Sequence, residues 1–130
     1  MKFSEDYGNS QYALTGYDDH YIQVNQTRYE QSLIITPSDL VIDWGPGTPE
    51  ELMNKSVMQT LIELQTEIVL LGTGRRIHFP PPEILALFSQ LQIGLEVLDS
   101  AAACRTFNIL LSEGRDVAAG LLLPGVETAH

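Results

Sequence analysis

Residues that could bind a small molecule follow an apolar run in the middle of the chain. Gly72, Thr73, Gly74 and Arg75 come directly after residues 68–71, which contain no polar side chain. Small residues at the end of a strand let backbone N–H groups approach an anion, and an arginine beside them supplies positive charge. The segment has neither the G-x-G-x-x-G spacing nor the lysine of a phosphate-binding loop. A tight turn and an anion-binding loop are therefore both compatible with it.

A second group of polar residues begins at Asp99 and Ser100, ahead of a helix that we expect at about residues 101–112. A carboxylate or a hydroxyl at this position can accept hydrogen bonds from the free N–H groups of a first helical turn. If the strands before the two groups are parallel, loops 72–76 and 99–108 lie at the same end of the sheet and form one cleft. The candidate ligand-binding residues of this cleft are Gly72, Thr73, Gly74, Arg75, Glu96, Asp99, Ser100, Cys104, Arg105 and Asn108.

Cys104 lies early in the expected helix, where the helix dipole favours a thiolate. A nucleophilic cysteine also needs a base, and His78 is the only plausible partner among the three histidines. Nothing in the sequence places His78 near Cys104, and a small buried cysteine on a helix face is the commoner arrangement. We therefore expect no catalytic residue.

Glu96 stands inside the apolar strand that we expect at residues 95–98. A carboxylate there needs a cation beside it or a position at the edge of a sheet. Arg105 is the first candidate partner and Arg75 the second. A structural ion pair is favoured over general acid–base catalysis, because buried carboxylates usually require a cation.

The composition argues against several classes of partner. The 130 residues carry a net charge of -10, which repels nucleic-acid phosphates and anionic lipid surfaces. No apolar run approaches the roughly 18 residues of a membrane-spanning helix. No His/Cys/Asp cluster has metal-ligand spacing, so we expect neither metal nor cofactor. The single cysteine and the acidic start, which resembles no presequence, favour a cytoplasmic bacterial protein.

The elements that must position these residues follow from the hydrophobic pattern. We expect a loosely ordered arm at residues 1–19, one domain at 20–124 and a tail at 125–130. The predicted strands are 21–24, 29–36, 40–44, 68–71, 95–98 and 116–123, and the predicted helices are 56–64, 82–92 and 101–112, with a short helical turn at 48–51. Ser56 is the cap expected for the first full helix.

This order of elements predicts an α/β domain with a mixed, mostly parallel central sheet, covering helices and an N-terminal β-hairpin. Trp44 ends the third predicted strand and stands next to a Gly-Pro-Gly turn. Such a tryptophan could contact a partner or cover the core. We favour the core, because a lone aromatic residue is weak evidence of an interface.

Three motifs resemble a small protein family. They are Leu70-Leu-Gly-Thr-Gly74, Phe79-Pro-Pro81 and Gly94-x-Glu-Val-Leu-Asp-Ser-x-Ala-Ala-Cys-Arg-Thr-Phe-Asn108. In their order and spacing they are similar to the complex I (NADH:ubiquinone oxidoreductase) assembly factor 3 family, with its uncharacterised bacterial and archaeal relatives. The similarity covers roughly residues 20–123.

The resemblance implies a three-layer β+α/β/α fold and no established catalytic activity. Its mitochondrial member helps to assemble the respiratory complex by associating with other assembly factors. We therefore expect a non-enzymatic interaction domain that binds partner proteins. The alternative is a domain or enzyme that binds a small anion in the cleft between loops 72–76 and 99–108. The oligomeric state stays open.

Overall fold

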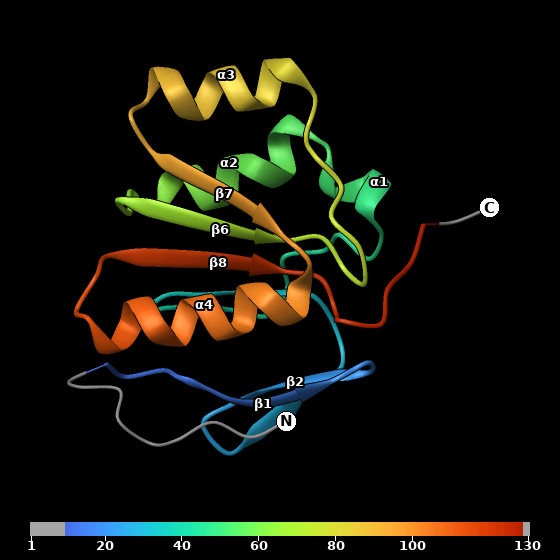
Figure 1. Cartoon of the computed structure of the whole chain (residues 1–130), viewed down its shortest axis with the longest axis vertical. Coiled ribbons are helices and arrows are strands. Elements are labelled where there is room, and N and C mark those ends of the chain that lie inside the picture. The colour runs from blue at the N-terminus through green and yellow to red at the C-terminus, as the bar shows by residue number, and fades with distance from the viewer. Residues whose placement is uncertain (1–9, 129–130) are drawn as a thin grey trace.

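The computed structural model of the chain describes residues 10–128 and contains two β-sheets and four helices in that range (Figure 1). A small antiparallel sheet has the order β1-β2-β3, and a larger mixed sheet has the order β5-β4-β8-β6-β7. In the larger sheet β6 runs parallel to both β7 and β8, whereas β4 runs antiparallel to β5 and β8. The predicted α/β class with a mixed sheet is confirmed.

The small sheet comprises β1 (Leu14–Asp18), β2 (Tyr21–Val24) and β3 (Thr27–Tyr29). Part of the loose arm expected at residues 1–19 is therefore a strand. The reason is that Leu14 is fully buried and Tyr17 nearly so, which gives this segment an apolar face to pack. Residues 1–9 of the expected arm lie outside the described part of the chain.

The larger sheet comprises β4 (Leu33–Ile35), β5 (Leu40–Val41), β6 (Ile68–Gly72), β7 (Gly94–Leu98) and β8 (Val117–Leu121). The return strand expected at residues 29–36 was wrong, since only Tyr29 belongs to β3, which closes the hairpin, and residues 33–35 form β4, which pairs with β5 and β8. All three residues of β4 are fully buried, so this strand needs cover on both faces. The strand expected at residues 40–44 ends at Val41.

Three of the four described helices begin at a residue whose side chain caps the first turn. Thr48 caps α1 (Pro49–Leu52), and Asp99 caps α4 (Ser100–Ser112) by accepting from the Ala102 N–H. Helix α2 (Lys55–Glu63) is capped by Asn54 rather than by Ser56, because the Asn54 side chain accepts from two N–H groups of the first turn. Helix α3 (Pro82–Gln90) starts at a proline, which needs no N–H partner there.

The larger sheet separates two apolar cores. One core lies between the sheet, α4 and the small sheet, and contains Phe107, Leu14 and Ile22. The other lies between the sheet and helices α2 and α3, and contains Phe88 and Trp44. Figure 1 shows α4 between the larger sheet and the small sheet, with α2 and α3 toward the other end of the molecule.

Trp44 belongs to the second core, as the sequence predicted. Its side chain is buried, and its Nε1–H donates a 3.0 Å hydrogen bond to the Val57 carbonyl. A Cβ at Gly120 would stand 2.7 Å from the Trp44 ring, so glycine allows the ring to lie against β8.

Candidate functional site

The two polar loops meet at the carboxyl ends of β6 and β7. These strands are parallel and paired from Ile68 with Gly94 to Gly72 with Leu98, so the residues that follow them emerge side by side. The Gly74 N–H donates to Ser100 Oγ over 2.8 Å, and the Ser100 N–H donates to the Gly74 carbonyl over 2.8 Å. The structure thus brings the two loops into direct contact.

This contact occupies part of the cleft that the sequence suggested. Thr73 and Ser100 are fully buried. A Cβ at Gly72 would lie 2.9 Å from Leu121 and 3.0 Å from Ser100, so the loops pack as closely as glycine permits. The Gly74 N–H, one of the donors that an anion would need, already serves the fold. The arrangement here stabilises a helix start and a strand end.

Arg75 is partly exposed at the edge of these loops. It forms ion pairs with Asp19 at 2.8 Å and with Glu127 at 3.1 Å, and all three side chains are about half exposed. The hydrogen bond from Arg75 lowers the pKa of the Asp19 carboxyl. Its positive charge therefore joins the β1–β2 turn to the segment after β8.

Arg105 and Asn108 of α4 contact β1 instead of the loops. Arg105 Nη1 donates to Tyr17 Oη over 2.7 Å. Asn108 Oδ1 accepts from the Leu14 N–H at 3.3 Å, and its Nδ2 donates to the Leu14 carbonyl at 2.6 Å. The small sheet therefore uses these two side chains for its attachment to α4.

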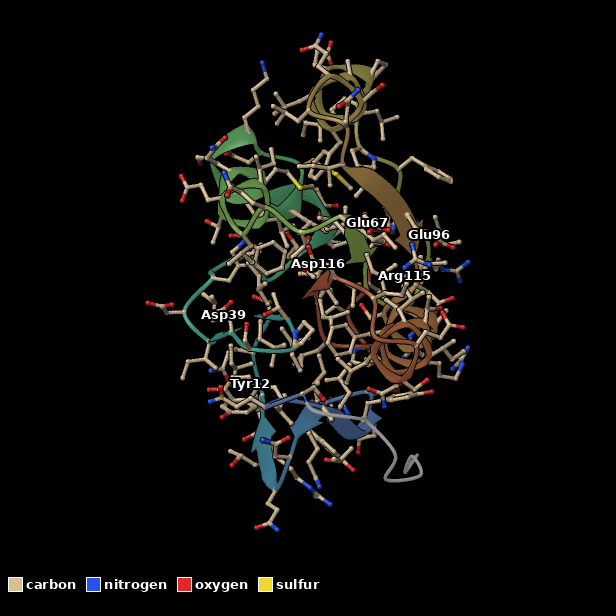
Figure 2. The ribbon with its side chains drawn as sticks, turned by 90° about the vertical axis from the view of Figure 1, so that its left-hand side faces the viewer. Tyr12, Asp39, Glu67, Glu96, Arg115 and Asp116 are labelled. Carbon is tan, nitrogen blue, oxygen red and sulfur yellow. The ribbon has the colours of Figure 1, made fainter. Side chains whose placement is uncertain are left out.

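Glu96 does not form the expected ion pair. It is exposed on β7, the edge strand of the larger sheet, and no ion pair among residues 10–128 joins it to Arg105 or Arg75. The edge position gives the carboxylate access to water, so it needs no cation. Figure 2 labels Glu96 on β7, together with Glu67, Arg115 and Asp116, which precede β6 and β8 in the chain.

Cys104 is fully buried on α4, and burial raises the pKa of its thiol to about 12. This is opposite to the thiolate that a helix N-terminus alone would favour. The nearby Arg105 charge lowers the pKa, but desolvation is the larger effect. The position suits an inert apolar side chain.

We predict that native Cys104 reacts with iodoacetamide at pH 8 at least about a hundredfold more slowly than in the denatured chain, because the thiolate is scarce and covered. Alkylation followed by mass spectrometry measures both rates. Because the folded-state pKa lies above the ordinary 9.0, the free energy of unfolding should also fall as pH rises from about 9 toward 12. Cys104→Ala should remove this pH dependence, and equal alkylation rates in the two states would contradict the prediction.

A groove lies at the same end of the larger sheet, and sequence reasoning missed it. It has a volume of about 360 Å³. We call it the Ile42 groove, and it is lined by Glu30, Gln31, Ser32, Ile42, Asp43, Gly45, Pro46, Gly47, Leu122, Leu123 and Val126. Three separate segments form it, so no local motif could have indicated it.

A second surface feature is the loop between β6 and α3, residues 73–81. Phe79 is 71% exposed and Ile77 is 47% exposed. Phe79 borders a shallow pocket with Met53 and Pro49 of the α1 region. An aromatic side chain with this exposure is available to a partner.

The described part of the chain lacks two features, a metal-binding cluster and a membrane-spanning helix. Residues 10–128 hold no group of three or more His, Cys, Asp or Glu side chains that could bind a metal ion. Over the same range, no helix has both the length and the apolar character needed to cross a membrane.

The sequence is similar to a family of known proteins. A family model described as "Protein of unknown function (DUF498/DUF598)" matches residues 14–122. NADH dehydrogenase (ubiquinone) 1 alpha subcomplex assembly factor 3 of Mus musculus is 37% identical over 90 residues, which are 68% of this chain and 49% of that protein. The Bos taurus assembly factor 3 is 32% identical over 117 residues, or 89% of this chain and 63% of that protein. The chain thus spans between about half and just under two thirds of these relatives.

The fold is shared with a solved bacterial protein. The solution structure of a Bordetella pertussis protein, described as a Mth938-like domain, matches with a TM-score of 0.81 and 30% identity. The match covers 98% of this chain and 95% of that one.

Proposed function

Because the chain belongs to the DUF498/DUF598 family, and is related to the assembly factor 3 proteins and to bacterial Mth938-like domains, we propose that it acts as an assembly-factor-like protein. In this role it binds partner proteins and catalyses no reaction. The observation that carries the proposal is its similarity to assembly factor 3, which extends over 89% of this chain for the bovine protein.

The surface of the domain supports this function. At the predicted anion site the Gly74 N–H donates to Ser100 Oγ, and the thiol of Cys104 is buried with a raised pKa. By contrast, the loop at residues 73–81 presents Phe79 and Ile77 to solvent. Exposed aromatic side chains are typical anchors of protein interfaces.

We further infer that the chain has the three-layer β+α/β/α arrangement that the resemblance implies, a view supported by the apolar cores on two sides of the larger sheet. The cytoplasmic location and the partners within a respiratory complex also stay predictions. They come from the composition and from the names of the relatives.

The proposal predicts that partner binding depends on Phe79. Phe79→Ser should reduce capture of partner proteins at least roughly tenfold, because interface anchors of this type contribute about 2 kcal/mol or more. The experiment cross-links the tagged chain in its native lysate and quantifies the captured proteins, with subunits of NADH:ubiquinone oxidoreductase and its assembly proteins as the expected class.

The matched control is Ile109→Ser. Ile109 is 57% exposed, but it lies on α4, away from the loop at residues 73–81. Capture should be unchanged in this variant. The absence of any reproducible partner for the wild-type chain would rule out the proposed function.

A further inference from the structure

We propose that the Ile42 groove binds an extended segment of a partner protein in which apolar side chains stand next to lysine or arginine. This inference rests on the proposed function, and it adds the site and the chemistry of the partner. Four observations carry it: the shape of the groove, its fixed walls, its unpaired acidic residues and a buried hydroxyl without a partner.

The groove exists because β5 separates early from β4. The two strands pair only between Ile35 and Leu40 and between Ile34 and Val41. After Val41 the chain turns away through Gly45, whose φ of 112° is a conformation that favours glycine. The space opened between this segment and the residues after β8 is mainly apolar, with Ile42 and Leu123 among its walls.

Hydrogen bonds made by the lining segments hold the walls in place. The Arg75 N–H donates to the Val126 carbonyl over 2.8 Å, and the Gly125 N–H donates to the Asp19 carbonyl over 2.9 Å. On the other side, Gln31 Nε2 donates to the Ile42 carbonyl over 3.3 Å. A groove that is already formed costs little ordering when a ligand enters it.

The charges at the groove have one sign. Glu30 and Asp43 are exposed, and neither forms an ion pair within residues 10–128. The lining contains no lysine or arginine. A segment that enters the groove meets this negative charge, so a basic partner is favoured and a phosphate-bearing one is repelled.

Ser32 supplies a specific polar contact. It is 7% exposed and lines the groove, yet its hydroxyl has no hydrogen-bond partner within residues 10–128. Buried polar groups in folded proteins are almost always hydrogen-bonded, to protein or to water, so this hydroxyl is free to bond a group that enters the groove. A volume of about 360 Å³ has room for a few side chains, which suits a segment of chain.

The test selects peptides from a random library displayed on phage against the full wild-type chain. We expect the enriched peptides to combine apolar residues with lysine or arginine. When added to the labelled protein, they should shift the NMR signals of residues 30–32, 42–47 and 122–126. The double variant Glu30→Lys/Asp43→Lys should weaken their binding by roughly tenfold or more, because two attractions become repulsions. Ser32→Ala should weaken it by a smaller factor.

The matched control is Glu63→Lys/Glu113→Lys, which changes the net charge equally through two exposed acidic residues outside the groove lining. Equal weakening in both double variants would show a general charge effect and overturn the inference. The inference also fails if no basic apolar peptide is enriched, if signals shift only elsewhere, or if sedimentation shows a dimer that the Glu30→Lys/Asp43→Lys variant dissociates. Phe79-dependent capture of partners would leave the proposed function standing in each of these cases.

Discussion

Replacing Phe107 with alanine should lower the free energy of unfolding by roughly 3–5 kcal/mol. Phe107 is fully buried on α4, in the core that this helix shares with the small sheet and with β8. The substitution removes a whole ring and leaves a cavity in a core built from α4, the small sheet and the larger sheet. Urea denaturation followed by the fluorescence of Trp44, the single tryptophan, measures the loss.

Phe79→Ala is the matched control for this prediction. It removes the same ring from a side chain that is 71% exposed, so the stability should change by less than about 0.5 kcal/mol. A cost below about 1 kcal/mol for Phe107→Ala would show that the α4 core repacks without difficulty. The same cost for both variants would contradict the burial on which the argument depends.

The sequence predicted the elements whose limits are marked locally. Asp99 caps α4, Pro82 starts α3 and Gly114 follows the end of α4, so the second half of the fold was assigned nearly as it is. Buried apolar runs indicated β6 and β8. These signals depend only on residues that are neighbours in the chain, and a single sequence contains them.

Pairing between distant segments could not be predicted in the same way. Residues 33–35 looked like the second strand of a hairpin, but they pair with β8, where Leu33 stands opposite Leu121. Residues 14–18 looked like part of an arm, but Leu14 is held by Asn108, 94 positions away. The apolar composition of a segment predicts that it is buried, but it does not indicate which other element packs against it.

The candidate site shows the same division. Parallel strands correctly suggested that the loops after β6 and β7 lie together, which follows from topology alone. Whether those loops leave space depends on where Ser100 Oγ points and on the left-handed φ of 95° at Gly74. The Ile42 groove was missed because its walls come from three segments with no common motif.

Asn108→Ala should destabilise the chain and loosen the small sheet more than the larger one. The Asn108 side chain is 8% exposed and satisfies both the N–H and the carbonyl of Leu14. Each buried group that loses its partner costs roughly 1–3 kcal/mol. Hydrogen exchange should therefore accelerate first in residues 14–18 and 21–24, while β6 and β8 stay protected.

Ser112→Ala on the same helix separates this effect from a general weakening of α4. Its hydroxyl also donates to a backbone carbonyl, that of Ile109 at 2.7 Å, but the site is exposed and water can replace the bond. We expect a change below about 0.5 kcal/mol and no change in exchange of the small sheet. Uniform acceleration of exchange across both sheets in Asn108→Ala would mean that β1 is not attached to α4 through this residue. Faster exchange confined to the small sheet would show that the hydrogen bonds of Asn108 attach the small sheet to α4.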